Sequence, residues 1–347
     1  MEIMRSGFGL FEGRMVELFT LTNSRGNSIA VTNYGATWAS AIVPDRDGKK
    51  GDVLLGYGSM QGYASDACYL GASIGRFANR IAAGRFAVDG VQYQTTVNNG
   101  DNTLHGGVDG LSFRLWDSRE EADGVTFSTV SPDGDQGFPG RLSVSVRYRW
   151  GNDDRVTIEF RATTDKATPV SLTNHAYFNL AGEGSVLDHQ LKIHADSFLP
   201  MLDGGVVYGE IRPVEGTPFD FRTAKAIGQD IEADDDQIRI CKGYDESFLV
   251  KNVDDGEMRL VAEACDPASG RALAMSSTYP TVHLYTANYF GGTLPGKGGK
   301  IYGEREAFCL EAQYSPNSPN LPDFPSCILR PGQEYKHTIE VAFTVKE

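Results

Sequence analysis

Four segments of the sequence place ionisable side chains among apolar residues and glycines, where a binding or catalytic site is expected more than a solvated surface. An acid, a base and hydrogen-bond donors are the kinds of group that such segments supply for proton-transfer chemistry. Taken singly, each also has a structural explanation, because arginines pair with surface carboxylates and histidines occur as bonded core residues. The segments are Gly75-Arg76-Phe77-Ala78-Asn79-Arg80-Ile81, Asn102-Thr103-Leu104-His105-Gly106-Gly107, Thr173-Asn174-His175-Ala176-Tyr177-Phe178-Asn179-Leu180 and Cys309-Leu310-Glu311-Ala312-Gln313-Tyr314.

The six histidines show no H-E-x-x-H or equivalent ligand spacing, so a metal site would need ligands from distant segments. His189, His194 and His337 stand among strand or turn residues, where surface or structural histidines are expected. We therefore expect no metal and no cofactor.

Two glycine-containing loops begin like ligand-binding motifs without completing them. Residues 291–297 match the glycine and lysine positions of a phosphate-binding loop, but Gly298 stands where Ser or Thr must hold magnesium. Residues 133–137 begin like a calcium loop, but Val144 occupies the position of the closing glutamate. We expect a surface loop at the first and a turn at the second.

Composition and charge exclude several classes of partner. The formal net charge is -14, and nucleic-acid binding depends on Lys and Arg that neutralise phosphates. No apolar run approaches the roughly 20 residues that cross a bilayer, and charged residues interrupt the first twenty positions, which argues against a secretory signal. The five cysteines are scattered without a C-x-x-C pair, which predicts reduced thiols. We expect a cytoplasmic protein that binds neither nucleic acid nor membrane.

The elements that must position these segments are strands. Apolar residues alternate with polar ones over 142–148, resume over 156–162 after a Gly-Asn-Asp-Asp break, and alternate again over 339–345. Asp89-Gly90 between 85–88 and 91–93 predicts a two-residue hairpin. Helical patterns are scarce, and neither repeats nor linkers are visible. We predict one all-β domain over 1–347, a large antiparallel β-sandwich with few short helices.

Together, in this order and at these separations, the four segments resemble the aldose 1-epimerase (galactose mutarotase) family. The family fold is a large antiparallel sandwich, the galactose mutarotase-like supersandwich, with a sugar cleft on one face. The resemblance covers nearly the whole chain and includes the 133–140 loop, Tyr244-Asp245, Tyr285-Thr286-Ala287-Asn288 and Arg330-Pro331-Gly332-Gln333.

The resemblance implies that the chain interconverts the α and β anomers of free aldoses such as glucose and galactose without a cofactor. His175 corresponds to the family's proton donor and Glu311 to its proton acceptor. A proton leaves the anomeric hydroxyl, another reaches the ring oxygen, and the resulting aldehyde recloses from its other face. The positions that match sugar-binding residues are Asn79, Arg80, His105 and Asp245.

Two positions near these presumed sugar contacts depart from the family pattern. His283 stands where glutamine is common, and we include it among the substrate-binding residues. Glu246 stands where a histidine usually follows Tyr244-Asp245. Both changes bear on the preferred sugar more than on the reaction. For Glu246, a solvent-exposed acid in a turn and a specificity residue are both open.

Other functions remain open at this stage. Asp245 and Glu311 have the residue types of a glycosidase pair, whose separation decides between retention and inversion. A sugar phosphate would need an additional basic pocket. A noncatalytic sugar-binding or sugar-sensing protein would keep the cleft without turnover. Neither the preferred aldose nor the choice between monomer and homodimer follows from the sequence.

Overall fold

The computed structural model describes residues 1–250, 255–290 and 295–347, and β-strands dominate this part of the chain. Its only α-helices are two short ones, α1 (Met60–Ala64) and α2 (Asp236–Cys241). The predicted all-β fold with few short helices is confirmed. Residues 291–294 of the predicted glycine-rich loop lie outside the described residues.

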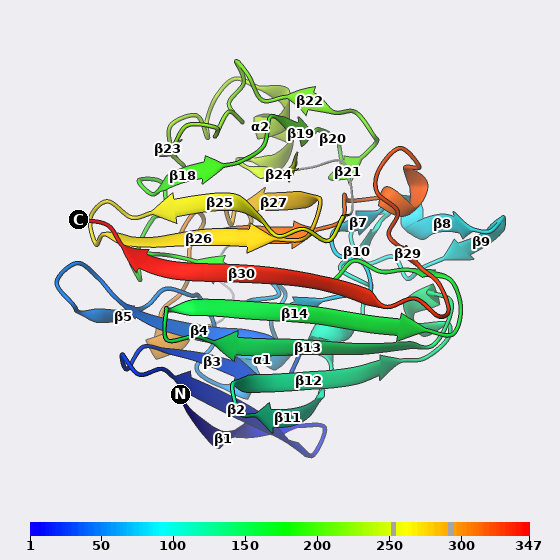
Figure 1. Cartoon of the computed structure of the whole chain (residues 1–347). Helices are drawn as coiled ribbons and strands as arrows, with labels where there is room; N and C mark the ends of the chain where they lie inside the picture. The colour runs from blue at the N-terminus through cyan, green and yellow to red at the C-terminus, as the bar shows by residue number, and fades with distance from the viewer. Residues whose placement is uncertain (251–254, 291–294) are drawn as a thin grey trace.

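The largest sheet has nine strands, several of which run side by side across the front of Figure 1. The alternating segments predicted at 142–148, 156–162 and 339–345 fall on three neighbouring strands of this sheet. In sheet order its strands are β11 (Asp117–Glu121), β12 (Gly124–Ser131), β13 (Leu142–Trp150), β14 (Arg155–Thr164), β30 (Tyr335–Val345), β26 (Arg271–Ser277), β25 (Arg259–Cys265), β18 (Gln190–Ile193) and β23 (Lys225–Ala226).

Two further sheets lie against it, and all the ladders between named strands are antiparallel. The six-stranded sheet contains, in order, β17 (Tyr177–Phe178), β28 (Phe308–Gln313), β27 (Thr281–Tyr285), β24 (Asp245–Leu249), β19 (Ser197–Leu199) and β22 (Arg212–Pro213). The five-stranded sheet contains β1 (Glu2–Phe11), β2 (Arg14–Thr22), β3 (Ser28–Thr32), β4 (Thr37–Pro44) and β5 (Lys50–Asp52).

Five two-stranded ladders complete the described architecture. One is the predicted hairpin, in which Asp89 has φ 52° and Gly90 has φ 80°, the positive values that a two-residue turn of this kind requires. The ladders are β8 (Arg85–Val88) with β9 (Val91–Gln94), β7 (Arg80–Ile81) with β10 (Thr103–Leu104), β6 (Ser73–Ile74) with β16 (Thr173–Asn174), β15 (Thr168–Pro169) with β29 (Ile328–Leu329), and β20 (Met201–Leu202) with β21 (Val206–Val207).

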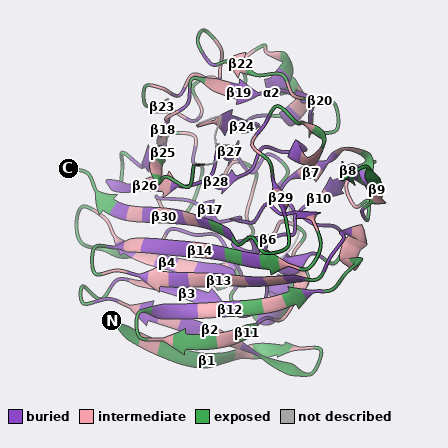
Figure 2. Cartoon of the chain, turned by 45° about the vertical axis from the view of Figure 1, so that its right-hand side comes forward, coloured by how far each residue is buried: buried purple, intermediate pink, exposed green. Residues whose placement is uncertain are grey.

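The sheets enclose one large hydrophobic core, which makes the architecture a sandwich. Rings meet across the layers: Trp38 of β4 lies edge-on to Phe343 of β30, with ring centroids 6.2 Å apart, and Phe19 of β2 lies 5.9 Å from Phe127 of β12. Residues from all three sheets belong to this buried cluster. Figure 2 shows the contrast between the mostly buried inner strands and β1, which is largely exposed at the rim.

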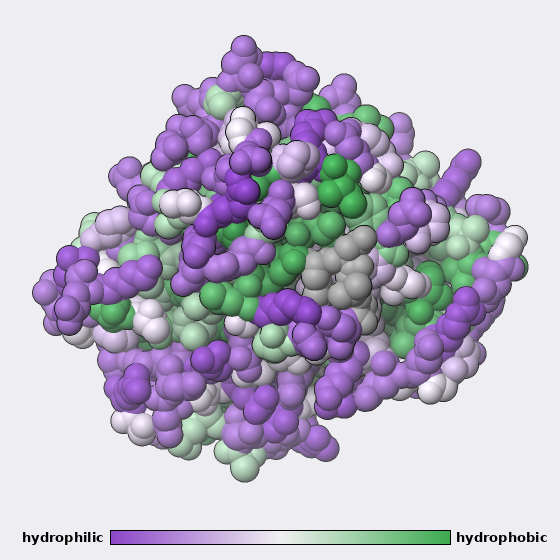
Figure 3. All heavy atoms as spheres, turned by 45° about the horizontal axis from the view of Figure 1, so that its top comes forward, coloured by the Kyte–Doolittle hydropathy of each residue, from purple (hydrophilic) through white to green (hydrophobic). Residues whose placement is uncertain are grey.

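One face of the surface and the cysteines can be described directly. Figure 3 shows a mostly hydrophilic face with hydrophobic residues gathered toward its middle. All five cysteines are free thiols, and four of them are buried. No helix among the described residues is long and apolar enough to cross a bilayer.

Candidate active site

The floor of the site is one face of the six-stranded sheet. Across β27 and β28, His283 is paired with Glu311, and across β24 and β27, Ser247 is paired with His283. Residues directly opposite each other on neighbouring strands share a face of the sheet, as do residues two apart along a strand. Asp245 therefore joins Ser247, His283 and Glu311 on this face, whereas the alternate residues of the same strands enter the core.

One wall comes from the β7–β10 ladder, in which Arg80 is paired with Leu104. Asn79 precedes one strand and His105 follows the other, and both adopt left-handed backbone, with φ 62° and 50°. Such conformations cost free energy for residues other than glycine and concentrate at functional sites. The Asn79 N–H donates to His105 Nδ1 over 3.2 Å, and Arg80 Nε donates to Asn99 Oδ1 over 3.0 Å. These bonds fix the wall side chains toward the sheet.

His175 lies between β16 and β17 and is held mainly by its main chain and by rings. Its N–H donates to the Ala72 carbonyl over 2.9 Å. Its ring is stacked on Tyr177 with centroids 4.9 Å apart, and lies edge-on to His105 at 5.2 Å. This packing brings His175 Nε2 to 3.5 Å from Glu311 Oε1.

All seven residues that the sequence predicted for the site line a single cleft of about 520 Å³. Sequence reasoning did not assign a role to the aromatic and thiol groups that complete the lining. Tyr69 carried no sequence signal, because an isolated loop residue has no periodicity to place it. The additional lining side chains include Cys68, Tyr69, Tyr177, Cys241, Tyr285 and Tyr289.

Burial favours the uncharged forms of His175 and Glu311. Burial, followed by the neighbouring His283, lowers the pKa of His175 to about 3. Burial, followed by the negative charge of Asp245, raises the pKa of Glu311 well above its usual range. The pKa of His105 is lowered well below its ordinary value, first by burial and then by His175. The shifts at His175 and Glu311 both favour the uncharged form of each group.

Each member of this pair also has a buried polar atom without a hydrogen-bond partner in the structure. These atoms are His175 Nδ1 and Glu311 Oε2. An unpaired buried polar atom is costly to stability and is uncommon in native proteins. The site therefore gives up some stability for groups that remain available to a ligand.

His105, His175 and Glu311 form a set whose ligand atoms lie within 4.8 Å of one another. The residue types would suit a transition metal. However, the Asn79 N–H donates to His105 Nδ1, so neutral His105 carries its hydrogen on Nε2. His105 thus presents a donor and no lone pair to the cleft, which suits a sugar oxygen better than a metal ion.

Glu246 corrects one of the two interpretations left open above. It is fully buried on β24 and is not a solvent-exposed acid in a turn. Its Oε2 accepts the N–H of Asp245 over 2.7 Å, and burial raises its pKa well above the usual range. As the strand alternates, Glu246 points away from the face that carries Asp245.

Several other sequence features do not reach the cleft. Arg76 is buried and donates to Ser131 and nearby carbonyls. Lys297 Nζ lies 2.7 Å from Asp52 Oδ2, so the described end of the glycine-rich loop uses its lysine in an ion pair. In the 133–137 turn, Asp135 is paired with Arg114 at 2.7 Å.

The three histidines expected at the surface or in structural roles each have a polar partner. The Leu180 N–H donates to buried His189 over 3.0 Å, and His194 lies 3.0 Å from Glu263 near the surface. Buried His337 lies within hydrogen-bond distance of Thr278 and Tyr314. These residues do not line the cleft.

Comparison with known proteins agrees with this geometry. The family model described as aldose 1-epimerase matches residues 17–342. The chain is 42% identical to galactose mutarotase of Rattus norvegicus, over 96% of this chain and 95% of that one. It is equally 42% identical to aldose 1-epimerase of Escherichia coli strain K12, over 96% of each chain.

Solved structures give the same result. An aldose epimerase homologue from C. elegans superposes with a TM-score of 0.87 at 32% identity, covering 94% of this chain and 98% of that one. Galactose 1-epimerase from Lactobacillus acidophilus NCFM superposes with a TM-score of 0.87 at 28% identity, covering 100% and 99%. The fold and these relatives place the chain in the class of sugar isomerases. The chain belongs to the aldose 1-epimerase family, and the expected family, fold and mutarotase activity are confirmed.

Proposed function

We propose that this enzyme interconverts aldose anomers with Glu311 as the base and His175 as the acid. The observation that carries the assignment is the 3.5 Å approach of His175 Nε2 to Glu311 Oε1 inside the cleft. Glu311 takes the proton of the anomeric hydroxyl while His175 gives one to the ring oxygen, and the ring carbon–oxygen bond breaks to give the aldehyde. Rotation about the adjacent carbon–carbon bond and reversal of both transfers give the other anomer.

The preference of the buried pair for its uncharged forms supports this scheme. Ring opening begins with the carboxylate of Glu311 and protonated His175, and it ends with protonated Glu311 and neutral His175. Burial favours the second state, as the directions of both pKa shifts indicate. The desolvated cleft therefore favours the protonation state that accompanies the open-chain aldehyde.

The remaining predicted residues hold the sugar. His105 offers Nε2–H and Arg80 offers guanidinium N–H groups to sugar oxygens, and Asp245 accepts from a hydroxyl. Asn79 and His283 border the same part of the cleft, with Asn79 Nδ2 3.5 Å from His283 Nε2. Holding the hydroxyls fixes the anomeric carbon against the acid–base pair, as positioning requires.

The wider setting of the enzyme belongs to this proposal. We take residues 1–347 to work as one domain, since residues from Phe19 to Phe343 share one core. The substrate is a neutral free aldose such as glucose or galactose, handled without metal, cofactor, nucleic acid or membrane. We place the enzyme in the cytoplasm, in keeping with its free cysteines, as a monomer or homodimer.

Polarimetry on freshly dissolved α-D-glucose and α-D-galactose tests the assignment. Wild-type enzyme should speed the drift to the same final rotation, and Glu311→Gln should lose that acceleration while retaining sugar binding. Glu334→Gln is the matched control, because it makes the same chemical change at an exposed ion pair with Arg161. Normal rates in Glu311→Gln would remove Glu311 from the base role.

A further inference from the structure

Three side chains of the site form a continuous hydrogen-bonded line across two neighbouring strands. Ser247 Oγ lies 2.9 Å from His283 Nδ1, and His283 Nε2 lies 2.8 Å from Asp245 Oδ1. Ser247 and His283 are directly paired in the β24–β27 ladder. All three residues are buried, with 1%, 2% and 9% of their surfaces exposed. The pairing register of β24 and β27 therefore places these three side chains next to one another.

The donors and acceptors along this line have a defined direction. A carboxylate only accepts, so His283 donates from Nε2–H to Asp245. The neutral ring then has its lone pair on Nδ1, which accepts the hydroxyl proton of Ser247. With both ring nitrogens bonded, His283 cannot flip without breaking a buried hydrogen bond.

Asp245 is also held from its main chain. Its N–H donates to Oε2 of Glu246, the residue that follows it on the strand. With Oδ1 bound to His283, Oδ2 is left to accept from a ligand in the cleft that Asp245 lines. Such a fixed carboxylate recognises a hydroxyl at one place and in one direction.

We propose that Ser247 and His283 are positioning residues that orient Asp245 toward one sugar hydroxyl, and so set the choice among neutral aldoses. This inference rests on the proposed function, because it needs a sugar bound with its anomeric carbon at His175 and Glu311. Ser247 does not line the cleft and acts only through His283.

The expected effect lies in substrate binding more than in the proton transfers. Asp245 accepts the same hydroxyl in the closed and the open-chain sugar, so its contact stabilises all bound states alike. Loss of such uniform binding raises KM and leaves kcat almost unchanged. A residue needed for proton transfer would lower kcat instead.

The test compares the kinetics of Ser247→Ala, His283→Gln and the double variant on galactose and glucose. Ser247→Ala should raise KM about five- to tenfold, the effect of loosening one hydrogen bond to a charged group, with kcat within about twofold. His283→Gln should raise KM by a similar factor and also change kcat, because His283 lowers the pKa of His175. The double variant should match His283→Gln, because Ser247 has no other route to the sugar. Ser277→Ala is the control, since Ser277 is a buried strand serine whose Oγ bonds the Thr338 carbonyl outside the cleft.

Deoxy sugars identify the hydroxyl. An analogue that lacks the hydroxyl accepted by Asp245 should show the raised KM with wild-type enzyme, and Ser247→Ala should raise it no further. If Ser247→Ala does not fold, Asp245→Asn replaces it, and His283→Gln should then add nothing in that background.

Two results would overturn the proposal. Unchanged KM values, or additive effects in the double variant, would show that the line has no part in recognition while wild-type mutarotation still stands. No acceleration by wild-type enzyme with any aldose would remove the proposed function and this inference together.

Discussion

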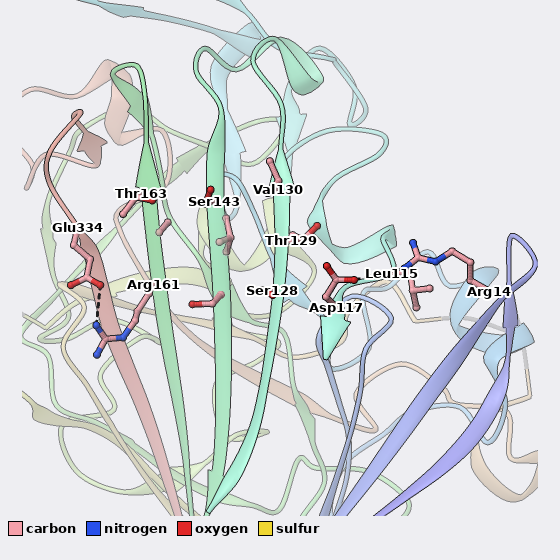
Figure 4. Close-up of a pocket in the computed structure, with 13 residues that line it drawn as sticks. Arg14, Leu115, Asp117, Ser128, Thr129, Val130, Ser143, Arg161, Thr163 and Glu334 are labelled. Carbon is pink, nitrogen blue, oxygen red and sulfur yellow. Dashed lines mark hydrogen bonds and ion pairs between the residues drawn. The ribbon is translucent and has the colours of Figure 1, made fainter. Parts of the chain in front are cut away.

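Two hollows of the described surface, each lined by charged residues, differ in how those charges are surrounded. One is the cleft over β24, β27 and β28. The other is a groove of about 580 Å³ on the outer face of β12, β13 and β14, shown in Figure 4. In the groove, Arg161 and Glu334 meet at 2.9 Å with side chains 44% and 51% exposed. In the cleft, His175 and Glu311 meet with 6% and 2% exposed.

The volume of a hollow therefore does not decide where a functional site lies. The groove is lined by serines and threonines together with charges that are solvated and paired. The cleft removes water from groups that titrate, and this shifts their pKa values in opposite directions. Buried and incompletely paired titratable groups, more than volume, distinguish the two regions.

The largest effect is expected when a histidine of the cleft is replaced and a histidine near the surface serves as control. His175→Asn should lower kcat by about 10²- to 10⁴-fold, the range typical of a lost general acid. The matched variant His194→Asn removes a partly exposed histidine paired with Glu263 and should keep the wild-type rate. Polarimetric rates at saturating sugar check both, and equal rates for the two variants would refute the role of His175.

The pH dependence of kcat/KM reports the shifted pKa values of the cleft. Activity requires that His175 and Glu311 together hold one proton. That proton is lost above the raised pKa of Glu311, and a second proton binds only near the pKa of His175, about 3. We expect kcat/KM to stay level from about pH 4 upward and then fall about tenfold per pH unit on the alkaline side. A fall on the acid side near pH 6.5 would show that His175 titrates as an ordinary histidine.

Replacing Glu311 should raise the stability of the fold while it lowers the activity. Its folded pKa is raised, so the folded state holds a proton that the unfolded chain has lost once the pH exceeds about 4.5, and stability declines as pH rises through this window. Glu311→Gln should therefore raise the free energy of unfolding by about 1 kcal/mol or more at pH 7, with little change near pH 4. Urea unfolding at the two pH values measures it, and a loss of stability at pH 7 would contradict the burial argument.

The smallest effect is expected in the groove. Arg161→Ala removes an exposed ion pair and should change the free energy of unfolding by less than about 1 kcal/mol. Mutarotation should be unaffected. A large loss of activity would assign the groove a function that its solvated charges do not suggest.

Much of the fold followed from periodicity in the sequence. Alternation placed β13, β14 and β30, and Asp-Gly placed the β8–β9 hairpin, because local rules govern these elements. The pairing order of the sheets did not follow, since it joins segments more than a hundred residues apart. The seven site residues were placed together by resemblance to a family and not by any local rule.

The same alternation explains what was missed on β24. Asp245 and Glu246 are adjacent on a strand, so placing the first in the cleft sends the second into the core. Charged residues are usually exposed, and this expectation hid the burial of Glu246. Ser247, two positions after Asp245, returns to the cleft face, and this spacing was the available signal for it.

The pairing of Ser247, His283 and Glu311 across neighbouring strands also bears on how such enzymes diversify. Hydrogen bonding holds adjacent strands about 4.8 Å apart whatever side chains they carry. A recognition residue on β24 or β27 can thus be exchanged while Glu311 on β28 keeps its place. In evolutionary terms, substitutions on one strand can change the substrate preference while selection preserves the residue that serves the reaction on the next strand.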